Sequence, residues 1–207
     1  MKIELQELNL TVSSIEGPIL KSPLTISIER GESVRVTGAN GCGKSTLLRV
    51  LSGFHKDYTG EYFVDGQSAR TLSPMLIRQA GLIYLPQHSF LFTSLSVKEF
   101  LQLLRGRCTV QTAVSRLRDV LNRINRRSKL LAQSGGIQQL LGLLSIVAQP
   151  ASFYLLDEPF RHLDFHVQEE VTNLLKVVFA NSNHGLILVD HQNVLRDGFC
   201  WDKTIHL

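Results

Sequence analysis

The sequence contains few cysteines and no long apolar run. Its three cysteines, Cys42, Cys108 and Cys200, are widely scattered and lack the spacing of a metal site, which is typical of a reducing compartment. No stretch of about eighteen apolar residues is present, so we expect no membrane-spanning helix. The opening MKIELQELNL carries acidic residues where a secretory signal peptide needs an apolar stretch. We therefore expect a cytoplasmic protein.

The sequence also lacks internal repeats and low-complexity segments. Hydrophobic residues make up 43% of the 207 residues and charged residues 19%, a balance that supports a large buried core and argues against disorder. The length is near the upper end of the single-domain range. We expect one continuous domain over residues 1–207.

The net charge of +4 is unevenly distributed along the chain. The segment from Ser96 to Lys129 contains nine basic residues against two acidic ones, Glu99 and Asp119. A positive face suits nucleic acid, anionic lipid or an acidic protein surface, and a solvated helical face explains it at least as well. The nine basic residues are Lys98, Arg105, Arg107, Arg116, Arg118, Arg123, Arg126, Arg127 and Lys129.

Short apolar runs predict four strands in the body of the chain. They lie at residues 33–37, 82–85, 153–156 and 186–189 and are bounded by glycine or polar residues. Apolar residues recur at helical spacing over 167–178, between the last two strands. A strand, a crossover helix and a second strand in this order predict parallel pairing.

The first thirty residues and the middle of the chain each differ in pattern from the predicted parallel core. Apolar residues alternate over 3–12 and again over 24–28, which predicts antiparallel strands. We expect an α/β fold whose core comprises 1–87 and 150–207, with an N-terminal antiparallel β-subdomain and an inserted helical subdomain at about 88–149. The insertion includes a strongly polar helix with a narrow apolar stripe formed by Val110, Val114, Leu117, Leu121 and Ile124.

The stretch GANGCGKST, residues 38–46, has the pattern of a phosphate-binding loop between a strand and a helix. Glycine tolerates left-handed backbone, so Gly41 and Gly43 allow successive N–H groups to point inward, and a helix beginning at Lys44 adds its positive dipole end. We expect Lys44 to contact the β- and γ-phosphates of a bound nucleotide and Ser45 to bind Mg²⁺. The expected nucleotide contacts are Gly38, Asn40, Gly41, Cys42, Gly43, Lys44, Ser45 and Thr46.

The stretch FYLLDEP, residues 153–159, ends an apolar strand in two adjacent carboxylates. Ligands collect at the strand ends of open parallel sheets. Neighbouring strand residues face opposite ways, so we expect Asp157 to hold Mg²⁺ and Glu158 to polarise the water that attacks the γ-phosphate. Without the phosphate-binding loop, an ordinary turn would be the better interpretation of this pair.

The order of these motifs resembles that of the nucleotide-binding subunits of ABC transporters, over nearly the whole chain. The resemblance implies a P-loop ATPase core of the ABC type, with Gln87 in LPQ contacting Mg²⁺ and the attacking water while coupling to a membrane partner. Asp164 in FRHLD resembles the aspartate of the dimer-contact loop, and His191 in LVDHQ is implied to bind the γ-phosphate. The catalytic residues we expect are therefore Glu158, His191, Gln87 and Lys44.

The stretch QSGGI, residues 133–137, stands where the family has its Leu-Ser-Gly-Gly-Gln signature. In the family this element contacts the γ-phosphate bound on the opposite subunit, which implies that role for Ser134, Gly135 and Gly136. Ser134 is also a candidate N-cap whose hydroxyl and following N–H groups suit an anion. Gln133 replaces the usual leucine and Ile137 the usual glutamine, which indicates weakened contacts across the dimer or weakened coupling to hydrolysis.

Other positions depart from the family pattern. No aromatic residue occurs between Leu10 and Leu20, where the family often stacks adenine, so we expect aliphatic contact from a residue such as Val12 or Ile19. Arg161 and His162 occupy positions where small residues are common. These departures are compatible with a slow ATPase.

We predict a cytoplasmic ATPase subunit that binds Mg-ATP, closes as a head-to-tail dimer and drives an ABC transporter. It is expected to lie on the inner face of the membrane, where the basic helical region and a groove near Gln87 receive a short helix of an integral membrane subunit. The brevity of the chain and its LLDEPF stretch resemble the ATP-binding subunit of the cytochrome c maturation heme exporter.

Two alternatives remain. The basic segment favours an ABC ATPase acting on nucleic acid or the ribosome, but such proteins carry long coiled-coil insertions or a second cassette for which this chain has no room. We therefore expect no direct nucleic-acid partner. Ile137 favours an ATP-binding switch that hydrolyses slowly.

Overall fold

The computed structural model describes most of the chain, in seven segments. Most of the basic segment and four residues of the expected apolar stripe, Val110, Val114, Leu117 and Ile124, lie outside the described residues. The fifth, Leu121, is described and lies in a buried hydrophobic cluster. The described residues are 1–11, 17–87, 94–104, 121, 127–179, 183–190 and 199–207.

The described part of the chain contains both strands and helices, with strands predominating before residue 82. The strands are β1 (Lys2–Leu10), β2 (Leu24–Glu29), β3 (Ser33–Thr37), β4 (Tyr58–Val64), β5 (Gln67–Ser68), β6 (Leu82–Leu85), β7 (Phe153–Asp157), β8 (Gly185–Val189) and β9 (Lys203–His206). The α-helices are α1 (Lys44–Leu51), α2 (Pro74–Gln79), α3 (Val97–Leu103), α6 (Gly135–Val147) and α7 (Phe165–Phe179), with single 3₁₀ turns at η1 (Ala69–Thr71) and η2 (Leu130–Ala132). Among the described residues, no helix combines the length and hydropathy needed to cross a bilayer.

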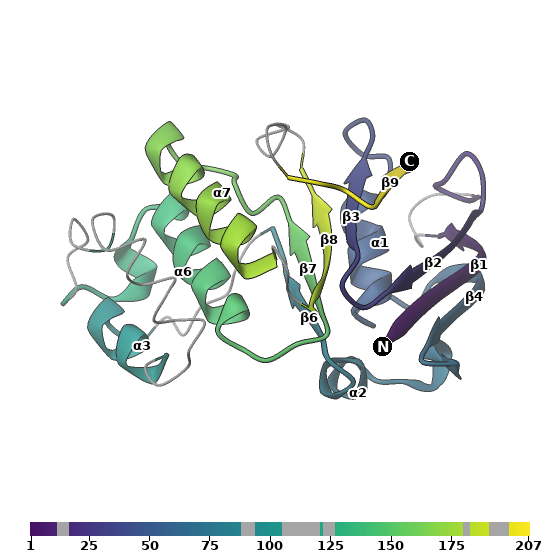
Figure 1. Ribbon diagram of the computed structural model, residues 1–207, viewed down its shortest axis with the longest axis horizontal. Coiled ribbons are helices and arrows are strands. Elements are labelled where there is room, and N and C mark those ends of the chain that lie inside the picture. Colours follow the sequence, from purple (N-terminus) through teal and green to yellow (C-terminus); the bar gives the residue numbers. More distant parts are fainter. Residues whose placement is uncertain (12–16, 88–93, 105–120, 122–126, 180–182, 191–198) are drawn as a thin grey trace.

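The centre of the molecule is a five-stranded parallel sheet with the order β6-β7-β8-β3-β9 (Figure 1). The four strands predicted from apolar runs are confirmed as β3, β6, β7 and β8. The predicted crossover is confirmed as well, because α7 connects β7 to its parallel neighbour β8. The phosphate-binding loop follows β3 and the acidic pair lies at the end of β7, so both are at the carboxyl edge of one sheet.

A second, antiparallel sheet has the order β2-β1-β4-β5 and confirms the expected N-terminal β-subdomain. β1 carries a register shift between Gln6 and Asn9, opposite Gly60 of β4. A Cβ at Gly60 would lie 2.2 Å from the carbonyl oxygen of Glu7, and the φ of Gly60 is +75°. Only glycine fits there, which allows β4 to follow the bulge in β1.

The parallel sheet separates two hydrophobic cores. Alternate residues of β8 face opposite ways: Leu186 and Leu188 pack with α6 and α7, whereas Ile187 and Val189 pack with α1 and the antiparallel sheet. Figure 1 shows the same arrangement, with α6 and α7 on one side of the sheet and α1 on the other. The sheet is therefore buried on both faces, as is usual for parallel strands.

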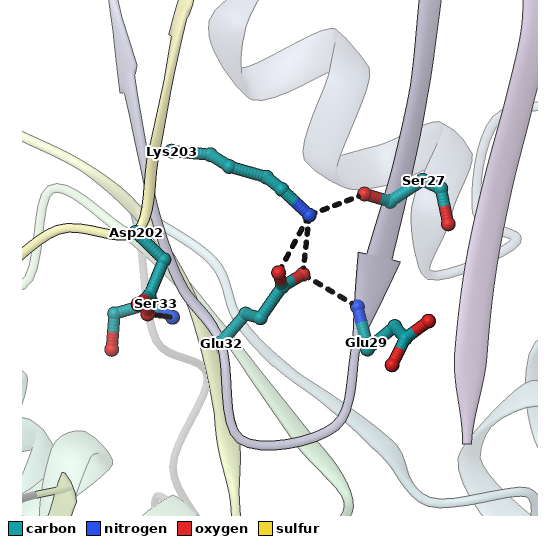
Figure 2. A network of polar contacts seen from close by, with 6 residues as sticks. All are labelled: Ser27, Glu29, Glu32, Ser33, Asp202 and Lys203. Carbon is teal, nitrogen blue, oxygen red and sulfur yellow. Dashed lines mark hydrogen bonds and ion pairs between the residues drawn. The ribbon is translucent and has the colours of Figure 1, made fainter.

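A polar clasp of Ser27, Glu32 and Lys203 joins the two sheets near the start of β3 (Figure 2). The Lys203 ammonium group of β9 donates to both carboxylate oxygens of Glu32, at 2.7 and 2.6 Å, and to the carbonyl oxygen of Ser27 in β2 at 2.7 Å. The Glu32 carboxylate also accepts a hydrogen bond from the backbone N–H of Glu29. The clasp fixes the N-terminal sheet against the edge of the core sheet.

Candidate nucleotide-binding site

The loop between β3 and α1 depends on glycine at several positions. The φ angles of Gly38, Gly41 and Gly43 are +144°, +80° and +102°, a region that side-chain-bearing residues rarely adopt. A Cβ at Gly38 would also lie 2.6 Å from the carbonyl oxygen of Leu207 and 2.7 Å from Cys42 Sγ. The sequence prediction of a glycine-shaped loop leading into a helix at Lys44 is confirmed.

The Lys44 side chain folds back over this loop. Its ammonium group donates to the carbonyl oxygens of Gly38 at 2.9 Å and Ala39 at 2.6 Å, and Lys44 is only 5% exposed. Asn40 lies on the exposed rim of the loop. A buried cation at the N-terminus of α1, held over a glycine-rich loop, is suited to bind phosphate oxygens.

The Asp157 carboxylate at the end of β7 is fully buried, and two hydroxyl groups donate to it. Ser45 Oγ donates to Oδ1 at 3.0 Å, and the Tyr84 hydroxyl of β6 donates to Oδ2 at 3.2 Å. Burial, followed by the negative charge of Asp157, raises the pKa of Tyr84, so its phenol keeps its proton at neutral pH. Carboxylate and hydroxyl oxygens are ligands that Mg²⁺ prefers, so Ser45 and Asp157 form a donor set that fits this ion.

Glu158 immediately follows the strand and adopts a left-handed backbone with a φ of +49°. Its carboxylate oxygen Oε2 accepts a hydrogen bond from Gln87 Nε2 at 2.7 Å and lies 3.6 Å from the guanidinium group of Arg161. Gln87 stands two residues after β6. The contact therefore joins the ends of neighbouring strands, and sequence reasoning anticipated both residues but not their direct bond.

The QSGGI segment begins helix α6. Ser134 is its N-cap and accepts a hydrogen bond from the backbone N–H of Ile137 at 3.4 Å, as the sequence predicted. Gly136 packs against the loop after β7, because a Cβ there would lie 2.4 Å from the carbonyl oxygen of His162. Gly135, in contrast, has open space where its Cβ would be. The two glycines therefore serve different purposes, one in packing and one on an exposed helix tip.

The matching model of the family described as "ABC transporter" covers residues 22–161. The chain belongs to the ABC transporter family. It is an ABC-type, ATP-binding ATPase subunit, because the family match agrees with the fold. The expectation of an ABC-type core with a parallel sheet and an antiparallel N-terminal sheet is thereby confirmed.

Relatives of this ABC ATPase include subunits of known transport systems. A Cyanophora paradoxa protein named "Probable ABC transporter ATP-binding protein in ycf23-apcF intergenic region" is 31% identical over 96% of this chain and 83% of its own length. The spermidine/putrescine import ATP-binding protein PotA of Legionella pneumophila (strain Paris) is 32% identical over 84% of this chain. The match covers 48% of PotA, so this chain spans about half of that relative.

A solved structure shares the fold. A bacterial Atm1-family ABC exporter with ATP bound superposes with a TM-score of 0.78 at 23% identity, over 95% of this chain and 36% of the exporter chain. At this level of identity the likeness concerns the fold alone. The narrower resemblance to a heme exporter stays a prediction.

Two expected contacts of the ABC ATPase site, His191 and Val12, lie outside the described residues. The other adenine candidate, Ile19, lies beside the phosphate-binding loop, since a Cβ at Gly43 would lie 3.1 Å from Ile19 Cγ2. Asp164 accepts a hydrogen bond from the backbone N–H of Val167 at 3.0 Å and so caps α7. Sequence reasoning missed the contact of Tyr84 with Asp157, because nothing local to either residue indicates a partner 73 positions away.

Proposed function

We propose that this ABC ATPase hydrolyses Mg-ATP and drives a transporter through ATP-dependent, head-to-tail pairing of two ATPase subunits. The contacts Ser45–Asp157 at 3.0 Å and Gln87–Glu158 at 2.7 Å carry the proposal. They join three segments that are distant in sequence at one edge of the sheet, where α/β folds bind ligands. Two identical chains, or this chain and a related subunit, supply the pair.

The phosphate-binding loop holds ATP in this proposal. The contacts are the eight residues expected from the sequence, with Lys44 turning from its own loop carbonyls to the β- and γ-phosphates. The metal ligands are Ser45, Gln87 and Asp157, and Mg²⁺ bound there neutralises developing charge on the phosphates.

Glu158 is the general base and accepts a proton from the attacking water. Gln87 holds the Glu158 carboxylate through its amide and leaves its own oxygen for the water or the metal. His191 is assigned to the γ-phosphate on the family resemblance. Ser134, Gly135 and Gly136 contact the γ-phosphate of the partner subunit, for which the 13-residue helix α6 offers an exposed N-terminus.

An exposed apolar patch supports docking of a membrane subunit. It consists of Phe54, Met75 and Leu76, which are 63%, 68% and 46% exposed. The end of α1 packs closely on α2, because a Cβ at Gly53 would lie 2.7 Å from Ile77 Cδ1. The patch lies near Gln87, since the Phe54 ring contacts Tyr84, three residues before it. An apolar patch on the surface marks an interaction site, and we assign it, with the basic region of 96–129, to a short helix of an integral membrane subunit.

The proposal divides the chain into a catalytic core and a helical subdomain, as expected from the sequence. The described strands all belong to the core at 1–87 and 150–207, and α3 and α6 belong to the helical subdomain at about 88–149. Peripheral attachment at the inner face of the membrane follows from binding the membrane subunit.

The test compares purified wild-type protein with Glu158→Gln, and with Glu169→Gln on the exposed face of α7 as the matched control. We expect all three to bind ATP and the Glu158 variant alone to lose hydrolysis, by roughly 100-fold or more. Failure of the wild type to bind ATP, or equal hydrolysis by the Glu158 and Glu169 variants, would contradict the proposal.

A slow ATP-dependent switch is the second candidate. Ile137 packs against the helical core, and the Arg161 cation lies 3.6 Å from the proposed base. Both arrangements favour slow turnover. Single-turnover hydrolysis measured with and without the membrane subunit distinguishes the two functions. A switch hydrolyses ATP slowly in both conditions. In that case we expect Arg161→Ser to raise the single-turnover rate of hydrolysis.

A further inference from the structure

Tyr84 contacts both the proposed magnesium site and the exposed apolar patch, which the proposed function uses separately. Its hydroxyl group donates to Asp157, and its ring contacts Phe54 with a centroid distance of 6.3 Å. Tyr84 is half-buried at the end of β6, beside the strand that carries Asp157. None of the roles assigned above requires this hydroxyl group.

The geometry at Asp157 requires an orienting group. The terminal torsion of an aspartate is broad and nearly two-fold, so the strand alone leaves the direction of the two carboxylate oxygens loosely defined. Ser45 of α1 and Tyr84 of β6 each donate to a different oxygen of this carboxylate. Two donors on the two oxygens define the plane of the carboxylate.

We propose that Tyr84 is a positioning residue that fixes the Asp157 carboxylate for magnesium. The inference rests on the proposed function, because it assumes that Asp157 takes part in Mg-ATP binding. Ser45 is not sufficient alone, since its oxygen serves the metal as well as donating to Asp157. Hydrogen bonds to a ligating carboxylate orient it, and their loss typically weakens metal binding about 10- to 100-fold.

A purely structural role is the competing explanation, because a buried phenol needs a partner for its own hydroxyl group. The chain contains a matched control for this explanation. Tyr62 of β4 is fully buried, and its hydroxyl group donates at 2.8 Å to the carbonyl oxygen of Leu51, outside the carboxylate cluster. Removing that hydroxyl group disturbs packing without changing the Asp157 carboxylate.

The experiment uses full-length wild type, Tyr84→Phe and Tyr62→Phe, with Mn²⁺ as the metal probe and a nonhydrolysable ATP analogue. Electron paramagnetic resonance measures bound Mn²⁺ at fixed nucleotide, and a parallel titration in chelator measures metal-free nucleotide binding. We expect Tyr84→Phe to raise the half-saturating Mn²⁺ concentration about 10-fold or more, with metal-free binding unchanged. Tyr62→Phe should match the wild type in both assays.

The possible results distinguish a failure of the proposed function from a failure of the proposed role of Tyr84. A wild type without metal-dependent nucleotide binding overturns the proposed function and the role of Tyr84 with it. A wild type that binds Mn²⁺ normally while Tyr84→Phe binds equally well overturns the role of Tyr84 alone. Equal losses in the metal-free and metal-dependent titrations of Tyr84→Phe also overturn it, because they indicate a structural role. Circular dichroism and thermal unfolding verify that both phenylalanine variants are folded.

Discussion

Gln87 Nε2 donates a hydrogen bond of 2.7 Å to Glu158 Oε2 and so joins the residues that follow β6 and β7. This contact needs neither a partner subunit nor a bound nucleotide. An amide is neutral at every accessible pH and offers both a donor and an acceptor. The same position therefore orients the carboxylate without changing the charge of the site.

The Gln87→Glu variant tests this coupling. It places a second carboxylate at hydrogen-bonding distance from Glu158, and two adjacent carboxylates disfavour each other's charged form. We expect the hydrolysis rate at saturating ATP to fall by about 10- to 100-fold, with smaller loss in Gln87→Ala, while ATP affinity changes little. The measurements are kcat and equilibrium nucleotide binding. Higher activity of the glutamate variant than of the alanine variant would contradict the prediction.

The neighbouring glycines of the QSGGI segment give opposite predictions. Gly136→Ala places a methyl group against the His162 carbonyl oxygen and should destabilise the protein by about 1–3 kcal/mol. Gly135→Ala meets open space, so we expect unchanged or slightly higher stability but impaired hydrolysis, because the methyl group lies on the helix tip offered to the partner site. Thermal unfolding and ATPase assays on the two variants measure both effects. Reversed stabilities would show that the helix tip packs differently.

The clasp between Lys203 and Glu32 should contribute to stability. Lys203→Ala removes an ion pair and a hydrogen bond to Ser27, both partly buried, and should cost about 1–2 kcal/mol. For a chain of this size that corresponds to a fall in Tm of roughly 2–8 °C. Lys2→Ala is the control, because the Lys2 side chain in its pair with Glu4 is more exposed than that of Lys203, and its loss should leave Tm unchanged within error. Equal shifts in the two variants would contradict a special role for the clasp.

The first turn of α3 should become less stable in acid. Hydrogen bonds from the Ser96 side chain and backbone lower the pKa of Glu99 below its ordinary value of 4.5, as part of a capping box. A carboxylate with a lowered folded-state pKa contributes stability above its unfolded pKa and loses it as the pH falls through the folded pKa. Hydrogen exchange of the α3 amides should therefore be slower in wild type than in Glu99→Ala near pH 7, with the difference vanishing well below pH 4.5. A difference that persists in acid would assign the protection to packing instead.

The sequence predicted the parallel core well because its strands are continuous apolar runs. Three strands were not predicted, for physical reasons. β4 is interrupted by Gly60, whose role is visible only beside the bulge at Glu7, and β9 buries only Ile205. β5 has only two residues, which is too short for a recognisable pattern. The phosphate-binding loop, Ser134 and the acidic pair were recognisable because their chemistry is local. The contacts Tyr84–Asp157 and Arg161–Glu158 were not, because they depend on how strands and loops meet in three dimensions.

Leu207 lies against the start of the nucleotide loop. Its backbone N–H donates to the Thr37 carbonyl oxygen at 3.0 Å, and its own carbonyl oxygen approaches Gly38 so closely that a methyl group there would collide. Leu207 therefore connects the end of β9 to the start of the nucleotide loop, and a substitution that shifts the Leu207 backbone is expected to shift Gly38 with it.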